Sequence, residues 1–376
     1  MNVDTELIVV GAGVIGCAVT WELARRGCRV QQFEAGRDLA QGATAAAGGV
    51  LTYDPTTDRP AAWHALASRS CAAQRRLQKE LTLALHGSSS APLWHWTGRL
   101  ELALSAEQLP ATKARLEADK PYAEGCVWLE RDALAELEPA LGCVAGGYWN
   151  PVDGYVDPVE LTRGLAHAAR LRGARLALGA RVSQIRVARD DRAGVVVDGR
   201  EHWAKHVILA NGAWVESLGI RAPAAIRPIK GQIVRVRCES GCPIRHVIYG
   251  NGVWLVPRPQ GLIVGATTED VGFAEGNTIA VGRLLQLACE LVPRLSAVAW
   301  DCLTPDFGFR PQSSDLIPRI GPDPEYRNVF WACGHHSNGI QMAPLTAELL
   351  ADAITRGEFS PLLTTSSASA GRAIES

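Results

Sequence analysis

The stretch Leu7-Ile8-Val9-Val10-Gly11-Ala12-Gly13-Val14-Ile15-Gly16 decides how the N-terminal part of this chain folds. Residues 6–10 form a short apolar run that ends in glycine, which is typical of a buried strand. Apolar side chains then recur at helical spacing over 14–26, Gly27 ends this helix, and 29–33 predicts a second strand. Strand, glycine turn, helix and strand together make one βαβ unit.

Each glycine of the turn has its own physical role. Gly11 permits the tight turn, Gly13 lets the backbone approach a pyrophosphate, and Gly16 lets the helix pack closely on the strand. The following helix directs free N–H groups and the positive end of its dipole at the phosphates. Glu34 lies 18 residues beyond Gly16, where its carboxylate can accept the ribose hydroxyls. The pattern therefore predicts a dinucleotide site, and the acidic residue argues against a 2′-phosphate and hence against NADP.

The bulk properties of the chain are those of an ordinary globular protein. At about 100–200 residues per domain, its 376 residues predict two domains. A net charge of −1 gives no reason to expect nucleic acid or an anionic membrane as a partner. The ten cysteines include no CxxC pair, so we expect reduced thiols rather than a metal site or a disulfide framework. Since we find no signal peptide and no apolar stretch of about 20 residues, we expect a soluble, cytoplasmic protein.

Alternating helix and strand patterns continue beyond the βαβ unit. A helix capped by Asp157, with Pro158 in its first turn, is expected to end at Leu171, and Pro344 is expected to open a last helix that reaches about Ile354. Helices are also expected over 61–85 and 280–291, helical segments before Leu137, strands at 94–104 (joined near Gly98), 175–178, 182–187, 206–210, 329–333 and within 228–268, a loop at 88–90 and a hairpin turn at Asp198-Gly199.

These patterns predict an α/β fold in which one domain is discontinuous. We expect residues 1–87, 151–222 and 305–364 to form the dinucleotide-binding domain. Residues 88–150 and 223–304 are expected to form a β-rich substrate domain, and 365–376 a flexible tail.

Five further motifs accompany the glycine turn. They are the small-residue loop Gly42-Ala43-Thr44-Ala45-Ala46-Ala47-Gly48-Gly49-Val50, Asp153-Gly154-Tyr155-Val156-Asp157-Pro158, Val207-Ile208-Leu209-Ala210-Asn211-Gly212-Ala213-Trp214, Gly308-Phe309-Arg310-Pro311 and Gly334-His335-His336-Ser337-Asn338-Gly339-Ile340. Together with residues 228–232 and 264–273, they resemble the D-amino-acid oxidase superfamily of flavoenzymes, and most closely its glycine oxidase (thiazole-biosynthesis) branch. The resemblance covers residues 7 to about 354.

This resemblance implies non-covalently bound FAD, an FAD-binding Rossmann-like domain, a mixed or antiparallel β-sheet substrate domain, and oxidation of a carbon that bears an amine. It places Val182 at the adenine, residues 44–49 along the flavin and residues 339–342 at the pyrimidine edge of the flavin. The residues assigned to FAD are Gly11, Gly13, Val14, Ile15, Gly16, Glu34, Ala35, Arg37, Thr44, Ala45, Ala46, Gly48, Gly49, Val182, Asn211, Gly212, Trp214, Arg310, Asn338, Gly339, Ile340, Gln341 and Met342.

The last helix adds a physical reason for this placement. A helix that opens at Pro344 points its N-terminus toward residues 339–342. A helix N-terminus stabilises a nearby anion by roughly 0.3–1 kcal/mol, and by about 2 kcal/mol in partly buried sites. Negative charge on a reduced flavin would be stabilised there, which would make FAD a better hydride acceptor.

Arg310 is the main candidate for binding the substrate. It has no acidic neighbour in the chain, and a guanidinium matches a carboxylate as a bidentate fork. The resemblance implies that it clamps the substrate carboxylate over the flavin. Hydride loss from a carbon that bears a neutral amine requires no protein base, so we nominate no catalytic dyad, and we expect His335 and His336 to have packing or orienting roles.

Two residues depart from the glycine oxidase pattern. Ser337 stands where that branch often has an arginine, and Trp254 stands where it has a tyrosine. These changes remove two polar contacts and add a large apolar wall. With Arg310, Trp254, His336 and Ser337 as the substrate-site candidates, we expect a bulkier or secondary amine rather than glycine.

Several functions remain open from the sequence. The first is an oxidase of a small amine or amino acid that passes electrons to O2 and yields H2O2. The alternatives are a dehydrogenase with another acceptor, a 2-hydroxy-acid oxidase that would need a base near the hydroxyl, and an FAD-bearing subunit without catalysis. An NAD-dependent dehydrogenase leaves the Arg310 and Gly339 motifs without a role. A homo-oligomer is possible, because eleven tryptophans could supply an apolar interface, although most tryptophans belong to the core.

Overall fold

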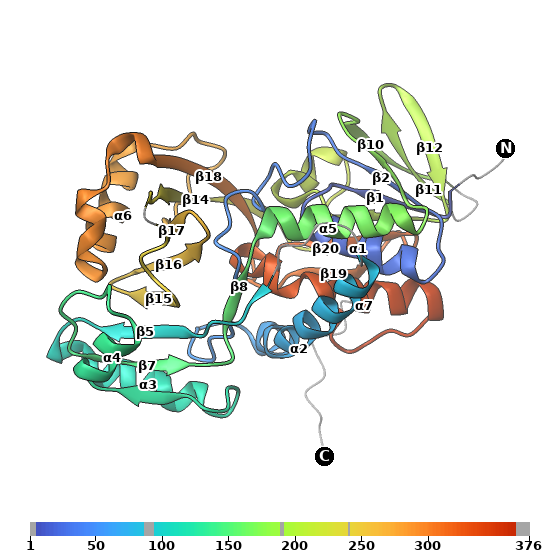
Figure 1. Cartoon of the computed structure of the whole chain (residues 1–376). Coiled ribbons are helices and arrows are strands. Elements are labelled where there is room, and N and C mark those ends of the chain that lie inside the picture. Colours follow the sequence, from blue (N-terminus) through green and yellow to red (C-terminus); the bar gives the residue numbers. More distant parts are fainter. Residues whose placement is uncertain (1–4, 86–93, 189–191, 240, 366–376) are drawn as a thin grey trace, which may run out of the picture.

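The computed structural model describes residues 5–85, 94–188, 192–239 and 241–365. Figure 1 shows two lobes side by side, with the strand β8 (Gly154–Val156) between them. One lobe holds a six-stranded sheet and the other an eight-stranded sheet. A small sheet pairs β8 with β3 (Val50–Leu51) and β4 (Trp94–His95).

The six-stranded sheet is apolar on both faces. Leu7 and Val9 of β1 lie in the core on the helical face, whereas Ile8 and Val10 lie in the core on the opposite face. A strand that is covered on both sides reads as a continuous apolar run. The spatial order is β19 (Arg319–Pro322), β20 (Val329–Cys333), β13 (His206–Leu209), β1 (Leu7–Val10), β2 (Val30–Phe33) and β9 (Arg175–Ala177), and only β19 runs antiparallel to its neighbour.

Helices cover one face of this sheet and a small β-meander covers the other. The helices are α1 (Val14–Arg25), α2 (Ala61–Ala84), α5 (Pro158–Leu171) and α7 (Gly339–Arg356), and the meander is β10 (Val182–Val187), β11 (Ala193–Val197) and β12 (Arg200–Ala204). The predicted cap of α5 is confirmed, because the Asp157 carboxylate accepts from the N–H groups of Val159 and Glu160 at 2.9 Å.

The second lobe is built on the eight-stranded sheet. Its core lies between this sheet and the helix α6 (Thr278–Leu291), with α3 (Leu109–Asp119) and α4 (Arg131–Leu137) along the β5–β7–β6 side. The spatial order is β18 (Leu303–Ser313), β14 (Ile226–Arg237), β17 (Gly261–Gly265), β16 (Val253–Arg258), β15 (Val247–Gly250), β5 (Arg99–Ala103), β7 (Gly146–Asn150) and β6 (Val127–Leu129).

The prediction that Pro344 opens the last helix is wrong. Helix α7 begins at Gly339, and Pro344 lies inside it. Proline removes the N–H that would bond to the carbonyl four residues earlier. The side-chain amide of Gln74 donates to that carbonyl, on Ile340, at 2.6 Å instead. Residues 339–342 are therefore the first turn of the helix itself.

The segment 94–150 also differs from the prediction. The two strands expected around Gly98 exist, but β4 belongs to the small sheet and β5 to the eight-stranded sheet. The expected helical segments are α3 and α4, whereas the strands β6 and β7 were not predicted. The predicted loop at 88–90 and most of the predicted tail lie outside the described residues.

The predicted division into domains stays a prediction, and one of its boundaries falls inside a strand. Residues 305–313 belong to β18, which pairs with β14 along its whole length, so this strand lies in the eight-stranded sheet. Within the described ranges, no helix is both long and apolar enough to span a membrane.

Candidate functional site

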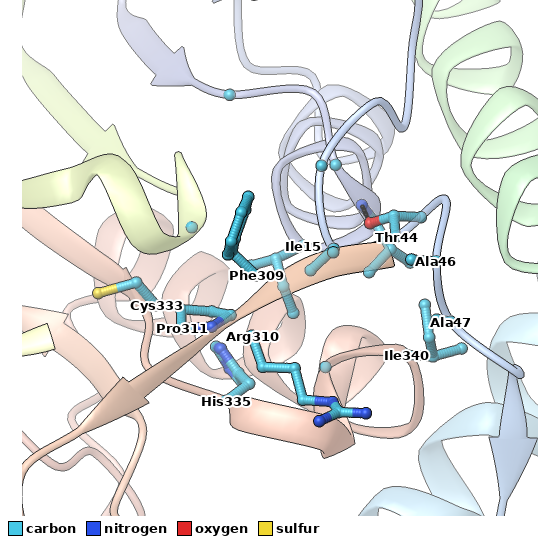
Figure 2. Close-up of a pocket in the computed structure, with 18 of the residues that line it drawn as sticks. Ile15, Thr44, Ala46, Ala47, Phe309, Arg310, Pro311, Cys333, His335 and Ile340 are labelled. Atoms are coloured by element: carbon cyan, nitrogen blue, oxygen red, sulfur yellow. Dashed lines mark hydrogen bonds between the residues drawn. The ribbon is translucent and has the colours of Figure 1, made fainter. Parts of the chain in front are cut away.

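A cavity of about 690 Å³ lies where the glycine turn after β1 approaches β18. Four segments that are remote in sequence form its wall. They are the glycine turn, the loop 41–50, β18 and the residues from His335 into α7. Figure 2 shows side chains from the loop, from β18 and from the start of α7 around this space.

The glycine turn brings bare backbone to the cavity. Gly11 has a φ of +99°, and a Cβ there would lie 2.6 Å from the carbonyl oxygen of Ala210. A Cβ on Gly16 would lie 2.1 Å from the carbonyl oxygen of Gly11, so only glycine allows the helix to pack this closely. A Cβ on Gly13 would meet only the Thr44 hydroxyl, at 3.2 Å. Gly13 therefore leaves room for a ligand to approach the N-terminus of α1.

Glu34 is fixed beside this turn at the end of β2. One carboxylate oxygen accepts from the N–H of Ala12 at 2.6 Å, and the other accepts from the N–H of Gly36 at 2.7 Å. Each carboxylate oxygen can accept a further hydrogen bond. The carboxylate is thus oriented by the backbone and still able to bind hydroxyl groups.

The loop 41–50 is held against the cavity by side chains from both lobes. The Thr44 hydroxyl accepts from the N–H of Val14 at 3.1 Å. Arg258 of β16 donates to the carbonyl of Gly48 at 2.9 Å, and Arg235 of β14 donates to the carbonyl of Ala45. This loop of small residues therefore keeps its position without large side chains that would fill the cavity.

Arg310 of β18 extends across the neighbouring strand β14. A Cβ on Gly231 would lie 2.3 Å from its Cζ, so the guanidinium rests on the bare backbone of that glycine. Its Nη1 donates to the carbonyl of Thr267 at 2.8 Å. Burial lowers the pKa of Arg310, against the opposing effect of Glu269, but an arginine stays charged at physiological pH.

Glu269 is engaged elsewhere and leaves Arg310 without a counter-ion. Its carboxylate pairs with Lys230 at 3.0 Å and accepts from Thr267 and Gln232. Burial raises the pKa of Glu269, but these hydrogen bonds outweigh burial and hold the pKa below its usual value. Within the described part of the chain, no carboxylate forms an ion pair with Arg310.

Trp254 of β16 forms an apolar wall. A Cβ on Gly48 would lie 2.5 Å from its indole ring, and a Cβ on Gly265 would lie 2.2 Å from it. The ring thus lies between two glycines and lines the cavity together with Tyr249, its partner across β15 and β16.

His335 and His336 are both neutral in this environment. Burial lowers the pKa of each to about 3, and Arg310 and Arg59 add to this effect at His336. His335 bonds to the Thr346 hydroxyl of α7 through Nε2 at 2.9 Å. His335 thus orients α7, as expected for a packing role, while His336 lines the cavity.

Comparison with known proteins decides the family. The model for the family described as FAD dependent oxidoreductase (DAO) matches residues 6–353. This chain belongs to that family. The resemblance inferred from the motifs and the predicted fold class are thereby confirmed.

Individual relatives support the assignment over nearly the whole chain. The chain is 34% identical to the bifunctional protein ThiO/ThiG of Trichormus variabilis, over 95% of this chain but only 54% of the relative. It therefore spans about half the length of that relative. It is 33% identical to a glycine oxidase of Geobacillus kaustophilus, over 94% of this chain and 93% of the relative.

Solved structures of the same family agree with the fold. The glycine oxidase from Geobacillus kaustophilus superimposes with a TM-score of 0.84 at 32% identity, covering 95% of this chain and 96% of that one. An iminodiacetate oxidase from Chelativorans sp. BNC1 gives a TM-score of 0.84 at 25% identity, with the same coverage of both chains.

The cavity fits the FAD of this oxidoreductase family. The bare glycine turn and the oriented Glu34 suit a pyrophosphate and a ribose, and the Oδ1 of Asn211 is a buried acceptor with no partner in the described residues. The first turn of α7 opens on the cavity, as expected for the end of a helix that favours negative charge.

Most of the residues that were assigned to FAD come together here. Gly16, Arg37, Ala45 and Met342 do not line the cavity: Gly16 and Met342 are packed inside the protein, Arg37 is exposed, and Ala45 contributes its carbonyl to Arg235. The assignment of single residues to FAD stays a prediction. The assigned residues that line the cavity are Gly11, Gly13, Val14, Ile15, Glu34, Ala35, Thr44, Ala46, Gly48, Gly49, Val182, Asn211, Gly212, Trp214, Arg310, Asn338, Gly339, Ile340 and Gln341.

The sequence interpretation missed three residues around the substrate end of the cavity. Thr52 and Tyr249 line the cavity, and Arg59 contacts His336 at 3.4 Å. None of them stands in a motif with a fixed spacing, so no sequence signal marked them. The described residues contain no cluster of histidine, cysteine, aspartate or glutamate that could hold a metal ion.

Proposed function

We propose that this chain catalyses the FAD-dependent oxidation of a small amine or amino acid to the imine. The observation that carries the proposal is the guanidinium of Arg310, which lies in the wall of the cavity without a carboxylate partner. A buried cation without a partner is costly, so it favours a ligand that brings a carboxylate. Glycine oxidase and iminodiacetate oxidase are the names of two similar proteins, and both name amines that carry a carboxylate.

FAD supplies the acceptor for the hydride that leaves the carbon next to the amine. The residues of the chain bind and orient the substrate. Arg310 holds the carboxylate as a bidentate fork, and the indole of Trp254 excludes water from the apolar side of the substrate. Gly339 and Ile340 present the N-terminus of α7, which stabilises negative charge by roughly 0.3–1 kcal/mol.

The neutral histidines fit amine oxidation better than oxidation of a 2-hydroxy acid. An alcohol needs a base near its hydroxyl group, and efficient bases have a pKa near the working pH. Burial holds the pKa of both His335 and His336 at about 3. An amine that is already neutral can lose hydride without such a base.

Further details extend this proposal. Trp254 in place of a tyrosine favours a substrate bulkier than glycine, because the indole offers apolar contact instead of a hydroxyl. We propose O2 as the electron acceptor, with H2O2 as product, and we keep a dehydrogenase with another acceptor as the alternative. A cytoplasmic location and a homo-oligomer stay predictions.

The experiment is a substrate panel with the purified FAD protein in air. Glycine, sarcosine, D- and L-amino acids, cyclic imino acids and 2-hydroxy acids are compared by H2O2 release and kcat/KM. We expect turnover with an amine that carries a carboxylate, and a higher kcat/KM for a larger amine than for glycine. Turnover of 2-hydroxy acids alone would refute the proposal, and glycine as the best substrate would refute its size argument.

A further inference from the structure

Two guanidinium groups act on one neutral imidazole at the substrate end of the cavity. The Nη2 of Arg59 lies 3.4 Å from the Nδ1 of His336. Arg59 and Arg310 both contribute to the low pKa of His336, after burial. Within the described residues, neither arginine forms an ion pair with a carboxylate. One end of the cavity therefore holds two cations without counter-ions.

The hydrogen-bonding groups at this end are donors. A guanidinium has only N–H donors, so the Nδ1 of His336 must accept from Arg59, and the proton of the neutral ring sits on Nε2. This Nε2 is buried and has no partner within the described part of the chain. Arg59, Arg310 and His336 thus all offer donors, which is the arrangement that an anionic ligand requires.

Arg59 comes from a loop that is held in place. Residues 52–60 connect β3 to α2, and His64 of α2 fastens this loop. Its Nδ1 lies 2.9 Å from the Tyr53 hydroxyl, and its Nε2 lies 3.2 Å from the carbonyl of Thr57. Asp54 in the same loop pairs with Arg115. The guanidinium of Arg59 is therefore presented at a fixed place, beside the ring of Trp63 at 5.8 Å.

A count of charges separates two kinds of substrate. A single carboxylate on Arg310 neutralises one cation and leaves Arg59 without a partner. Burial lowers the pKa of Arg59, so a half-buried cation persists there at a desolvation cost. A substrate with two carboxylates would neutralise both arginines and would also accept from the Nε2 of His336.

We propose that Arg59 is a specificity-determining residue that binds a second acidic group of the substrate. The preferred substrates are then amines that carry two carboxylates, one held by Arg310 and the other by Arg59 with His336. This inference rests on the proposed function, because it assigns the first carboxylate to Arg310.

The test compares acids with their uncharged amides of the same shape. Iminodiacetate is compared with its monoamide, and D- and L-aspartate with D- and L-asparagine, by anaerobic flavin reduction in the FAD-loaded protein. Arg59→Gln removes the charge, Arg59→Lys restores it, and Arg69→Gln removes one charge from an exposed position of α2. Binding without turnover is followed by the change that succinate and its monoamide cause in the visible spectrum of FAD.

We expect kcat/KM for the diacid to exceed that for its amide by about tenfold or more, which corresponds to ~1.4 kcal/mol. Arg59→Gln should abolish this preference through KM while kcat for the monoacids is unchanged. Arg59→Lys should retain part of the preference, and Arg69→Gln should retain all of it.

Equal kcat/KM values for acid and amide, or a preference that survives in Arg59→Gln, would overturn the inference alone. If no amine reduces the flavin, the proposed function fails, and the succinate experiment still decides the inference. Tighter binding of succinate than of its monoamide, lost in Arg59→Gln and retained in Arg59→Lys, would support the second acid site. Equal binding of the two would refute it.

Discussion

The side-chain amide of Gln74 on α2 replaces the hydrogen bond that Pro344 removes from the carbonyl of Ile340. The distance from Nε2 to this carbonyl oxygen is 2.6 Å, and the same amide lies 3.1 Å from the carbonyl of Gln341. The Oε1 of Gln74 accepts from the indole of Trp94 at 3.0 Å. Because Gln74 is fully buried, it fixes the first turn of α7 at the wall of the cavity.

Replacing Gln74 should therefore destabilise the protein strongly. Gln74→Leu leaves the carbonyl of Ile340 and the indole N–H of Trp94 buried without partners, at a cost of about 1–3 kcal/mol for each group. Urea unfolding of the FAD-loaded protein measures this loss. Gln78→Leu is the matched control, because half-buried Gln78 accepts only from the indole of Trp96, so its loss should be smaller. Equal losses for the two variants would show that the gap at Pro344 has no special role.

Arg310 should control the affinity for the substrate carboxylate. Arg310→Lys removes the bidentate fork and keeps the charge, so we expect kcat/KM to fall by about 10- to 100-fold, in line with about 1.5–3 kcal/mol for a hydrogen bond to a charged group. Steady-state kinetics with the best amine from the panel measures the change. The control is Arg235→Lys on the adjacent strand, where the guanidinium pairs with Asp306. A kcat/KM for Arg310→Lys within twofold of the unmodified protein would exclude the clamp.

Gly231 offers a second test of the same clamp without touching Arg310. A Cβ at this position would lie 2.3 Å from Cζ, so Gly231→Ala should displace the guanidinium and raise KM, with FAD content unchanged. Gly282→Ala is the control, since its Cβ would meet nothing within 4 Å and alanine is favoured over glycine in a helix by about 0.5–1 kcal/mol. An unchanged KM in Gly231→Ala would mean that the position of the guanidinium does not limit binding.

Buried histidines should make the protein less stable in acid. The pKa of His335 is about 3 in the folded protein and 6.5 in its unperturbed state, so the unfolded chain binds more protons between these two values. Stability therefore rises with pH from about 3 to 6.5 and is constant above this range with respect to this group. At pH 5 the cost is about 2 kcal/mol. Urea unfolding at pH 5 and 7.5 should show a pH dependence that is smaller by about this amount in His335→Gln, and an equal dependence would contradict the account.

The local signals in the sequence predicted the dinucleotide part of the fold well. The glycine turn, Glu34 and the Asp157 cap act through neighbours in sequence or through one βαβ unit, so their patterns are short and legible. Pro344 misled the prediction, because proline usually starts a helix and the replacement donor, Gln74, lies 270 residues away. The strand β7 was missed because its glycines are set by contacts between strands: a Cβ on Gly147 would lie 2.6 Å from the carbonyl oxygen of Glu101.

The substrate end of the site could be predicted only in part. Arg310 and Trp254 stand in recognisable motifs, and both line the cavity. Arg59 belongs to a loop without a motif and reaches His336 only through the tertiary fold. The argument that this site lost polar contacts at Ser337 and Trp254 was thus incomplete, because Tyr249 and Arg59 bring polar groups from other segments.

The most direct test of the central proposal is anaerobic mixing of the purified FAD-loaded protein with amines and 2-hydroxy acids, followed by the visible spectrum. The account predicts that the flavin bands bleach with an amine that carries a carboxylate and stay unchanged with the matching 2-hydroxy acid. Bands that bleach only with the hydroxy acid, or a protein that binds no FAD, would contradict it.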